Sequence, residues 1–132
     1  MNAATDVTGF GLVGHLHEIA EASGCSAFID LAAVPLLDGA LKWAAADVVP
    51  GRTAEIVAWA SEFVEWRAPE SEEADSGLWM KVLCDPQTSG GLLMAVPAQN
   101  LGSLVDRLQD SGVLAAVIGV FAEGHSGQVI VR

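Results

Sequence analysis

A carboxylate stands directly before a predicted helix in residues 5–12, whose sequence is TDVTGFGL. A helix N-terminus offers unpaired N–H groups and a partial positive charge, and phosphate groups bind there. Asp6 beside such an end suits a Mg²⁺ ion that bridges to nucleotide phosphates, and Gly9 and Gly11 let the backbone approach a ligand closely. The alternative is that Asp6 and Thr8 only cap the helix by accepting hydrogen bonds from its first N–H groups. On the residues alone, both interpretations stay open.

The same stretch contains the glycines of a dinucleotide-binding pattern, GxGxxG, in GFGLVG at residues 9–14. Asp30 follows at the end of a predicted strand, roughly where a ribose-binding acid stands in such sites. That fold requires a buried strand immediately before the first glycine. Residues 1–8 are short and polar and leave no room for one, so we do not expect a dinucleotide site.

A second polar cluster, CDPQTSGG at residues 84–91, stands ahead of an apolar segment. Its amide and hydroxyl side chains and two adjacent glycines make a compact polar turn. The pattern is compatible with a binding loop, and equally with a turn that leads into a strand and is capped by Asp85. The spacing alone favours the structural interpretation.

The histidines and cysteines predict no further site. His15 and His17 are two apart on a predicted helix, so they point to different faces and cannot share a metal ion. His125 lies in a glycine-rich turn and is expected to be exposed. Cys25 and Cys84 lack metal-site spacing and are expected to be buried, reduced thiols. The sequence contains no nucleophile-elbow and no Walker lysine pattern.

The spacing of apolar residues predicts the elements that position these groups. A helix capped by Thr8 is expected to run to Ser23, followed by a strand over Ser26–Leu31. Further helices are expected over 36–44, from a cap at Thr53 onward, over 78–83 and over 101–108. Further strands are expected over 63–67, 91–96, 115–121 and 128–131, the last two as hairpin partners, and an exposed acidic loop over 68–77. This order predicts one domain over residues 1–132, of α/β or layered α+β class, with helices packed on a mixed β-sheet.

The composition excludes several kinds of partner. Hydrophobic residues make up 52% of the 132 residues and charged residues 17%, with a net charge of −11. A nucleic-acid-binding protein needs a basic surface, and an acidic surface is repelled by anionic lipids, so we expect neither nucleic acid nor membrane as a partner. The longest apolar run, Val113–Phe121, is shorter than the about 20 residues of a membrane-spanning helix, and no signal peptide is evident. We expect a cytoplasmic protein whose apolar surface packs on something outside this sequence.

The two motifs together resemble one family. TDVTGFGLVGHLHEIA at residues 5–20 and VLCDPQTSGGLLMAV at residues 82–96 are similar to the paired signatures of the C-terminal domain of the selenide, water dikinases, or selenophosphate synthetases. These belong to the aminoimidazole ribonucleotide synthetase superfamily, and the resemblance covers nearly the whole chain. It implies the C-terminal-domain fold of that superfamily. It also implies a reaction that uses ATP and Mg²⁺ to make selenophosphate from selenide, with release of AMP and phosphate.

The resemblance also assigns roles to residues. Asp6 would be a metal ligand, and Thr5 and Thr8 would line the phosphates beside it. Gly9 and Gly11 would allow close packing at the helix start, and the QTSGG turn would shape the site or be structural. The implied binding groups of this chain are therefore one metal ligand and four residues around it.

The remaining parts of the implied enzyme lie in an N-terminal half that this sequence does not contain. That half would supply a catalytic Cys or selenocysteine, a Lys, further metal-binding aspartates and the contact of a homodimer. We therefore expect no catalytic residue in this chain and no activity from it alone. Two alternatives stay open: a non-catalytic, truncated paralogue that binds a partner or nucleotide, and the C-terminal domain of another ATP-dependent enzyme of the superfamily.

Overall fold

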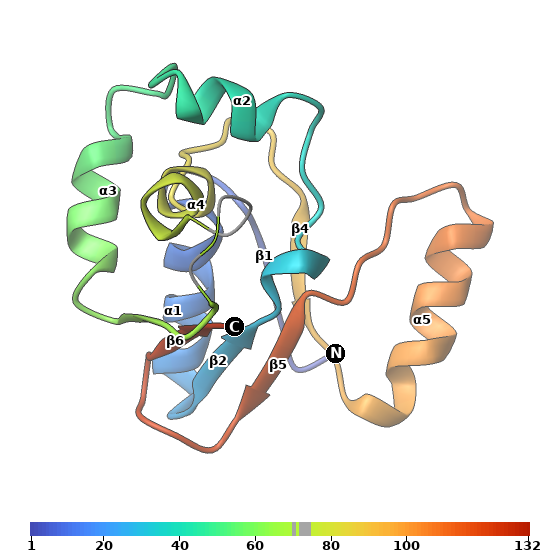
Figure 1. Cartoon of the computed structure of the whole chain (residues 1–132). Coiled ribbons are helices and arrows are strands. Elements are labelled where there is room, and N and C mark those ends of the chain that lie inside the picture. The colour runs from blue at the N-terminus through green and yellow to red at the C-terminus, as the bar shows by residue number, and fades with distance from the viewer. Residues whose placement is uncertain (70, 72–74) are drawn as a thin grey trace.

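The computed structural model describes residues 1–69, 71 and 75–132 (Figure 1). Its strands are β1 (Ala3–Asp6), β2 (Ser26–Ile29), β3 (Val64–Trp66), β4 (Leu92–Ala95), β5 (Gly119–Ala122) and β6 (Val129–Val131). Its helices are α1 (Gly11–Ser23), α2 (Ala40–Ala45), α3 (Thr53–Ala60), α4 (Ser76–Leu83) and α5 (Ala98–Asp110), with a short 3-10 helix at Leu31–Ala33. The predicted acidic loop falls partly on residues 70 and 72–74, which lie outside the described residues, and its last two residues begin α4.

A four-stranded mixed sheet, in the order β3-β6-β2-β5, forms the centre of the fold. β6 runs parallel to both β2 and β3, and β5 is antiparallel to β2. Helix α1 packs on β2 and β6 and also contacts α3 and α4. The core therefore forms where Val13 and Ala20 of α1 meet Ile29 and Val129 of the sheet, all of them almost fully buried. This arrangement confirms the predicted α/β class with helices on a mixed sheet.

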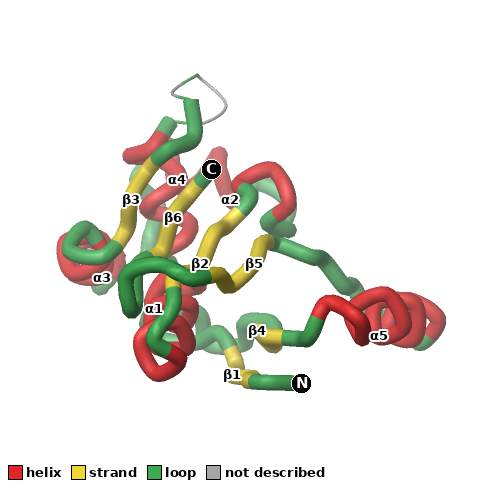
Figure 2. Tube along the Cα trace, turned by 90° about the horizontal axis from the view of Figure 1, so that it is seen from below, coloured by secondary structure: helices red, strands yellow, loops and turns green. Residues whose placement is uncertain are grey.

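A separate two-stranded ribbon of β1 and β4 lies beside the sheet (Figure 2). The strands are antiparallel, and Asp6 is paired with Leu92. The expectation that residues 1–8 leave no room for a strand is therefore wrong. β1 is stabilised by a partner some ninety positions away, which local spacing cannot reveal. The strand alternates between exposed and half-buried residues, so it is not the buried strand that a dinucleotide site requires.

The expected hairpin of the last two strands is also wrong. β5 and β6 lie on opposite sides of β2 and pair with it rather than with each other. The turn between them passes over the start of β2, where the Ala27 N–H donates to the Gln128 carbonyl and the Ser26 hydroxyl donates to the His125 carbonyl. β5 itself begins at Gly119, so residues 115–118 are not part of the strand.

Two threonines expected to cap helices do not do so. Phe10 occupies the N-cap position of α1 and makes no side-chain capping bond. Thr53 is the first residue of α3, and its buried hydroxyl has no hydrogen-bond partner in the described part of the chain. A side-chain cap does occur at α4, where the Leu78 N–H donates to Asp75 at 2.6 Å. Helix α2 begins only at Ala40, because Gly39 before it has a φ of 84°.

Helix α5 stands apart from the other helices (Figure 1). It is the amphipathic helix that the sequence predicted, and it extends over Ala98–Asp110. None of its residues is buried, and the leucines of its apolar stripe are only partly covered. The chain that follows includes Leu114, which is 80% exposed. No helix among the described residues is long and apolar enough to cross a membrane.

Candidate functional site

The two sequence motifs meet in space and form one structural unit. Pairing of β1 with β4 places Thr5 opposite Leu93. Beyond the ribbon, the Val7 N–H donates to the Gly91 carbonyl at 2.9 Å, and the Gln87 N–H donates to the Thr8 carbonyl at 3.1 Å. The turn at residues 84–91 is therefore the support on which the loop between β1 and α1 rests.

Close backbone packing at this junction requires glycine at two positions. Gly11 has a φ of +66°, and a Cβ there would lie 2.7 Å from the Leu83 carbonyl oxygen and from the Cys84 carbonyl carbon. A Cβ on Gly90 would overlap the carbonyl oxygen of Val7. Gly9 differs, because a Cβ there would have no neighbour within 4 Å. Close packing at the helix start is thus confirmed for Gly11, whereas Gly9 does not contribute to it.

Asp6 lies at the end of β1 with its side chain exposed to solvent. Within the described residues, its carboxylate makes no hydrogen bond or ion pair, and those residues contain no group of three or more His, Cys, Asp or Glu side chains that could hold a metal ion. Mg²⁺ takes about six oxygen ligands. One open carboxylate fits a metal site that is shared with other groups, and it does not amount to a complete site.

Thr8 makes hydrogen-bond contacts through its N–H, its hydroxyl group and its carbonyl group. Its N–H donates to Nε2 of His15 at 3.0 Å, and its hydroxyl oxygen lies 3.1 Å from the same nitrogen. Its carbonyl accepts from the Gly11 N–H and from the Gln87 N–H, each at 3.1 Å. The other ring nitrogen of His15, Nδ1, lies 2.9 Å from a carboxylate oxygen of Glu18.

The contact of His15 with Thr8 was not predicted, because the two histidines were considered only as ligands of a shared metal ion. As expected, they point to different faces of α1. His17 contacts the Gly127 carbonyl through Nδ1 at 2.7 Å and stacks on Phe63 at 3.8 Å between ring centroids. The spacing of His15 and Glu18 at i and i+3 was the available signal of a side-chain pair.

Burial affects two ionisable groups in the second motif. It raises the pKa of the Cys84 thiol to about 12, and the side chain is fully buried. It also raises the pKa of the half-buried Asp85 carboxyl. Cys25 is only partly buried, contrary to expectation, and the two thiols form no disulfide. A protonated, enclosed Cys84 is a packing residue and not a nucleophile.

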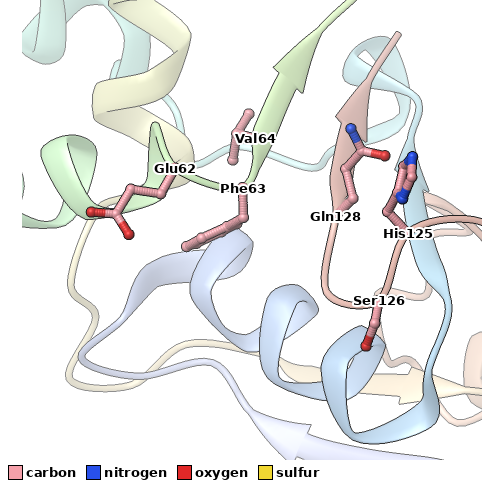
Figure 3. Close-up of a pocket in the computed structure, with 6 residues that line it drawn as sticks. All are labelled: Glu62, Phe63, Val64, His125, Ser126 and Gln128. Carbon is pink, nitrogen blue, oxygen red and sulfur yellow. The ribbon is translucent and has the colours of Figure 1, made fainter.

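A hollow of about 250 Å³ lies elsewhere, between the α3–β3 connection and the β5–β6 turn (Figure 3). Phe63, His125 and Gln128 are among its lining residues, and His125 is exposed as predicted. Ser126 donates to the Glu21 carbonyl, which places the hollow near the C-terminal end of α1. The junction of the two motifs lies at the N-terminal end of α1, so this hollow is not part of the candidate site.

Comparison with known proteins supports the family that the motifs indicated. A family model described as "AIR synthase related protein, C-terminal domain" matches residues 1–132. The selenide, water dikinase of Carboxydothermus hydrogenoformans is 39% identical over 132 residues, which are 100% of this chain and 36% of the relative. That of Shewanella baltica is 42% identical over 119 residues, which are 90% of this chain and 32% of the relative. The chain thus spans about a third of the length of the curated relatives it matches.

A solved structure gives independent evidence for the fold. Thiamine-monophosphate kinase from Stenotrophomonas maltophilia superposes with a TM-score of 0.57 and 19% sequence identity, over 98% of this chain and 30% of that protein. At this identity the likeness concerns the fold alone.

Proposed function

Since the chain belongs to the family of AIR synthase related proteins, C-terminal domain, we propose that it is the C-terminal part of an ATP-dependent selenophosphate synthetase. The observation that carries the proposal is the junction of the two motifs, which presents the carboxylate of Asp6 to solvent beside the start of α1. In this role the domain closes over a nucleotide site whose other groups belong to the rest of the enzyme.

The residues around Asp6 suit a Mg²⁺ ion held jointly with that remaining part. Asp6 would supply a hard oxygen ligand, and Thr5 and Thr8 would line the phosphates that the ion bridges. When bound, Mg²⁺ neutralises phosphate charge as phosphoryl groups are transferred. The chain's own contribution is to hold Asp6 in place through the β1–β4 ribbon and the turn at residues 84–91.

The decisive experiment uses a chimera. This chain replaces the matching 36% of the Carboxydothermus hydrogenoformans selenide, water dikinase, and AMP formation from ATP is measured with and without selenide. We expect selenide-dependent AMP from the chimera and none from this chain alone. Asp6→Asn in the chimera should lower the rate by more than about tenfold, the lower end of the cost of losing even an outer partner of a bound metal.

The matched control is Asp38→Asn, which removes an equally negative, exposed side chain from the connection between the 3-10 helix and α2. It should leave the rate unchanged. A chimera that unfolds cooperatively on heating but makes no AMP would contradict the assignment to selenophosphate synthesis. AMP formation that is independent of selenide would instead favour another ATP-dependent member of the superfamily, and selenide-dependent AMP from the chain alone would refute its proposed inactivity.

A further inference from the structure

The β1–β4 ribbon has one face on the core and one face towards solvent. Side chains alternate along each strand, and directly paired residues of an antiparallel ribbon point to the same side. Leu93 of β4 belongs to the buried core, so the next pair, Asp6 with Leu92, points away from it. Ala4 and Met94 form the following pair on that side. These four residues, Ala4, Asp6, Leu92 and Met94, are the outward face of the ribbon.

The outward face presents apolar side chains next to one carboxylate. Leu92 is 63% exposed, Ala4 is exposed and Met94 is half-buried. Within the described part of the chain neither strand pairs with a third one, and the ribbon lies at the margin of the molecule (Figure 2). Two strands alone are marginally stable in water, and burial of exposed apolar area is favourable. A partner that covers Leu92 would therefore stabilise both the contact and the ribbon.

The position of the N-terminus indicates which partner this is. The matching family model is that of a C-terminal domain, and this chain matches 36% of the Carboxydothermus hydrogenoformans enzyme, so the larger part of that enzyme lies outside the match. Met1 is 72% exposed and stands two residues before β1. The Asn2 N–H donates to the Ala95 carbonyl at 2.8 Å, so a preceding segment would enter along the ribbon itself.

Charge argues against a second copy of the chain as the partner. Asp6 is paired with Leu92, and burying an unpaired carboxylate is costly, so the partner must bring positive charge or leave Asp6 at the rim of the contact. Each copy carries a net charge of −11. Much of its positive charge is already engaged in ion pairs with its own carboxylates, at Arg52, Arg67, Lys81 and Arg132.

We propose that the outward face of the ribbon is the docking surface for the part of the enzyme that precedes Met1, with Leu92 as its apolar anchor and Asp6 at its polar rim. The inference rests on the proposed function, because that function makes this chain the C-terminal part of a larger enzyme. It goes further by naming the surface that meets the remainder. It also assigns a location to the apolar contact that the composition led us to expect.

The test compares amide hydrogen–deuterium exchange, measured by mass spectrometry, in this chain alone and in the chimera with the Carboxydothermus hydrogenoformans enzyme. The chain alone carries a flexible Gly/Ser extension of about ten residues before Met1, so that β1 has no free end in either protein. We expect the amides of residues 2–6 and 91–95 to exchange at least about tenfold more slowly in the chimera, because packing on the outward face suppresses local opening of the ribbon.

Variants of Leu92 separate docking from strand stability. Leu92→Thr keeps a residue that favours strands but removes the apolar anchor, so exchange in the chimera should return to the rate of the chain alone, and the chain alone should be unchanged. Leu92→Ile keeps the apolar volume and should retain the protection. Leu37→Thr is the matched control, since Leu37 is 87% exposed and lies outside the ribbon, and it should change neither rate.

The outcomes distinguish this inference from the function on which it rests. Equal exchange of the ribbon in the two proteins, or protection that survives Leu92→Thr, would overturn the docking surface while selenide-dependent AMP formation by the chimera could still uphold the function. Protection that appears in the chain alone as its concentration rises would make a second copy the partner and would also overturn the inference. Protection that depends on Leu92 in a chimera that makes no AMP would leave the docking surface standing and refute selenophosphate synthesis.

Discussion

At the scale of single residues, the two glycines of the first motif make a matched pair for testing the motif junction. Gly11→Ala would place a methyl group in a left-handed backbone conformation and against the carbonyl of Leu83, so we expect it to lower the free energy of unfolding by about 2–4 kcal/mol. Gly9→Ala should change it by less than about 0.5 kcal/mol, because a Cβ there meets nothing. Urea unfolding measures both values. Equal losses would show that Gly11 is not packed as described.

The two cysteines make a second residue-scale prediction. With a pKa of about 12 and no exposed surface, Cys84 should be unreactive towards an aromatic disulfide reagent at pH 8, where only about one thiol in 10,000 is ionised. The partly exposed Cys25 should react first. The folded chain should therefore release one equivalent of chromophore quickly and the second only after unfolding. Cys25→Ser should abolish the fast phase, and a fast phase that survives this change would contradict the burial of Cys84.

The residues of the candidate site could be found from the sequence because both motifs are contiguous. Residue type and spacing alone singled out Asp6 and the turn at residues 84–91 but left their roles open, and the family resemblance supplied those roles. The contacts across the junction could not be predicted from the sequence. Gly11 packs against Cys84, and Thr8 contacts His15, because of how the chain folds back on itself.

At the scale of elements, α1 and α5 provide an internal comparison, since each has 13 residues. Helix α1 has six buried residues and α5 has none. Amide protection depends on tertiary packing more than on helix propensity, because isolated helices of this length are marginal in water. Hydrogen–deuterium exchange should therefore be much faster in α5 than in α1. Comparable protection would mean that α5 is packed against something, either its own chain or a second molecule.

Local patterns predicted these helices and the strand β2 because their signals lie within one segment. The two errors in topology have a common origin. β1 forms a strand because it pairs with β4, and β5 and β6 lie apart because each of them pairs with β2. All three pairings join segments that are far apart in the sequence. Short strands of three or four residues carry too few side chains to indicate their partners.

At the scale of the whole molecule, the net charge of −11 makes copies of the chain repel one another, whereas an exposed apolar surface favours their association. Leu114 is 80% exposed and Val117 48%, both in the segment between α5 and β5. We expect the chain to self-associate weakly at low salt and more strongly at 0.5 M NaCl, because added salt screens the charge repulsion but not the apolar contact. Sedimentation velocity at several concentrations measures this.

The double variant Leu114→Asp, Val117→Asp should abolish the association. Leu37→Asp is the control, since Leu37 is 87% exposed but lies on the connection to α2. Either a monomer at every salt concentration, or equal effects of the two variants, would argue against an interface in the segment between α5 and β5.

The place of β6 in the centre of the sheet has a consequence for synthesis on the ribosome. Ala27 of β2 pairs with Val129, so the older strand is made 102 positions before the neighbour that completes it. At typical elongation rates of about 5–20 residues per second, β2 waits roughly 5–20 s for β6. β3 is made later than β2 and therefore waits for a shorter time. During this interval their unpaired edges are exposed, and an exposed strand edge can pair with another chain.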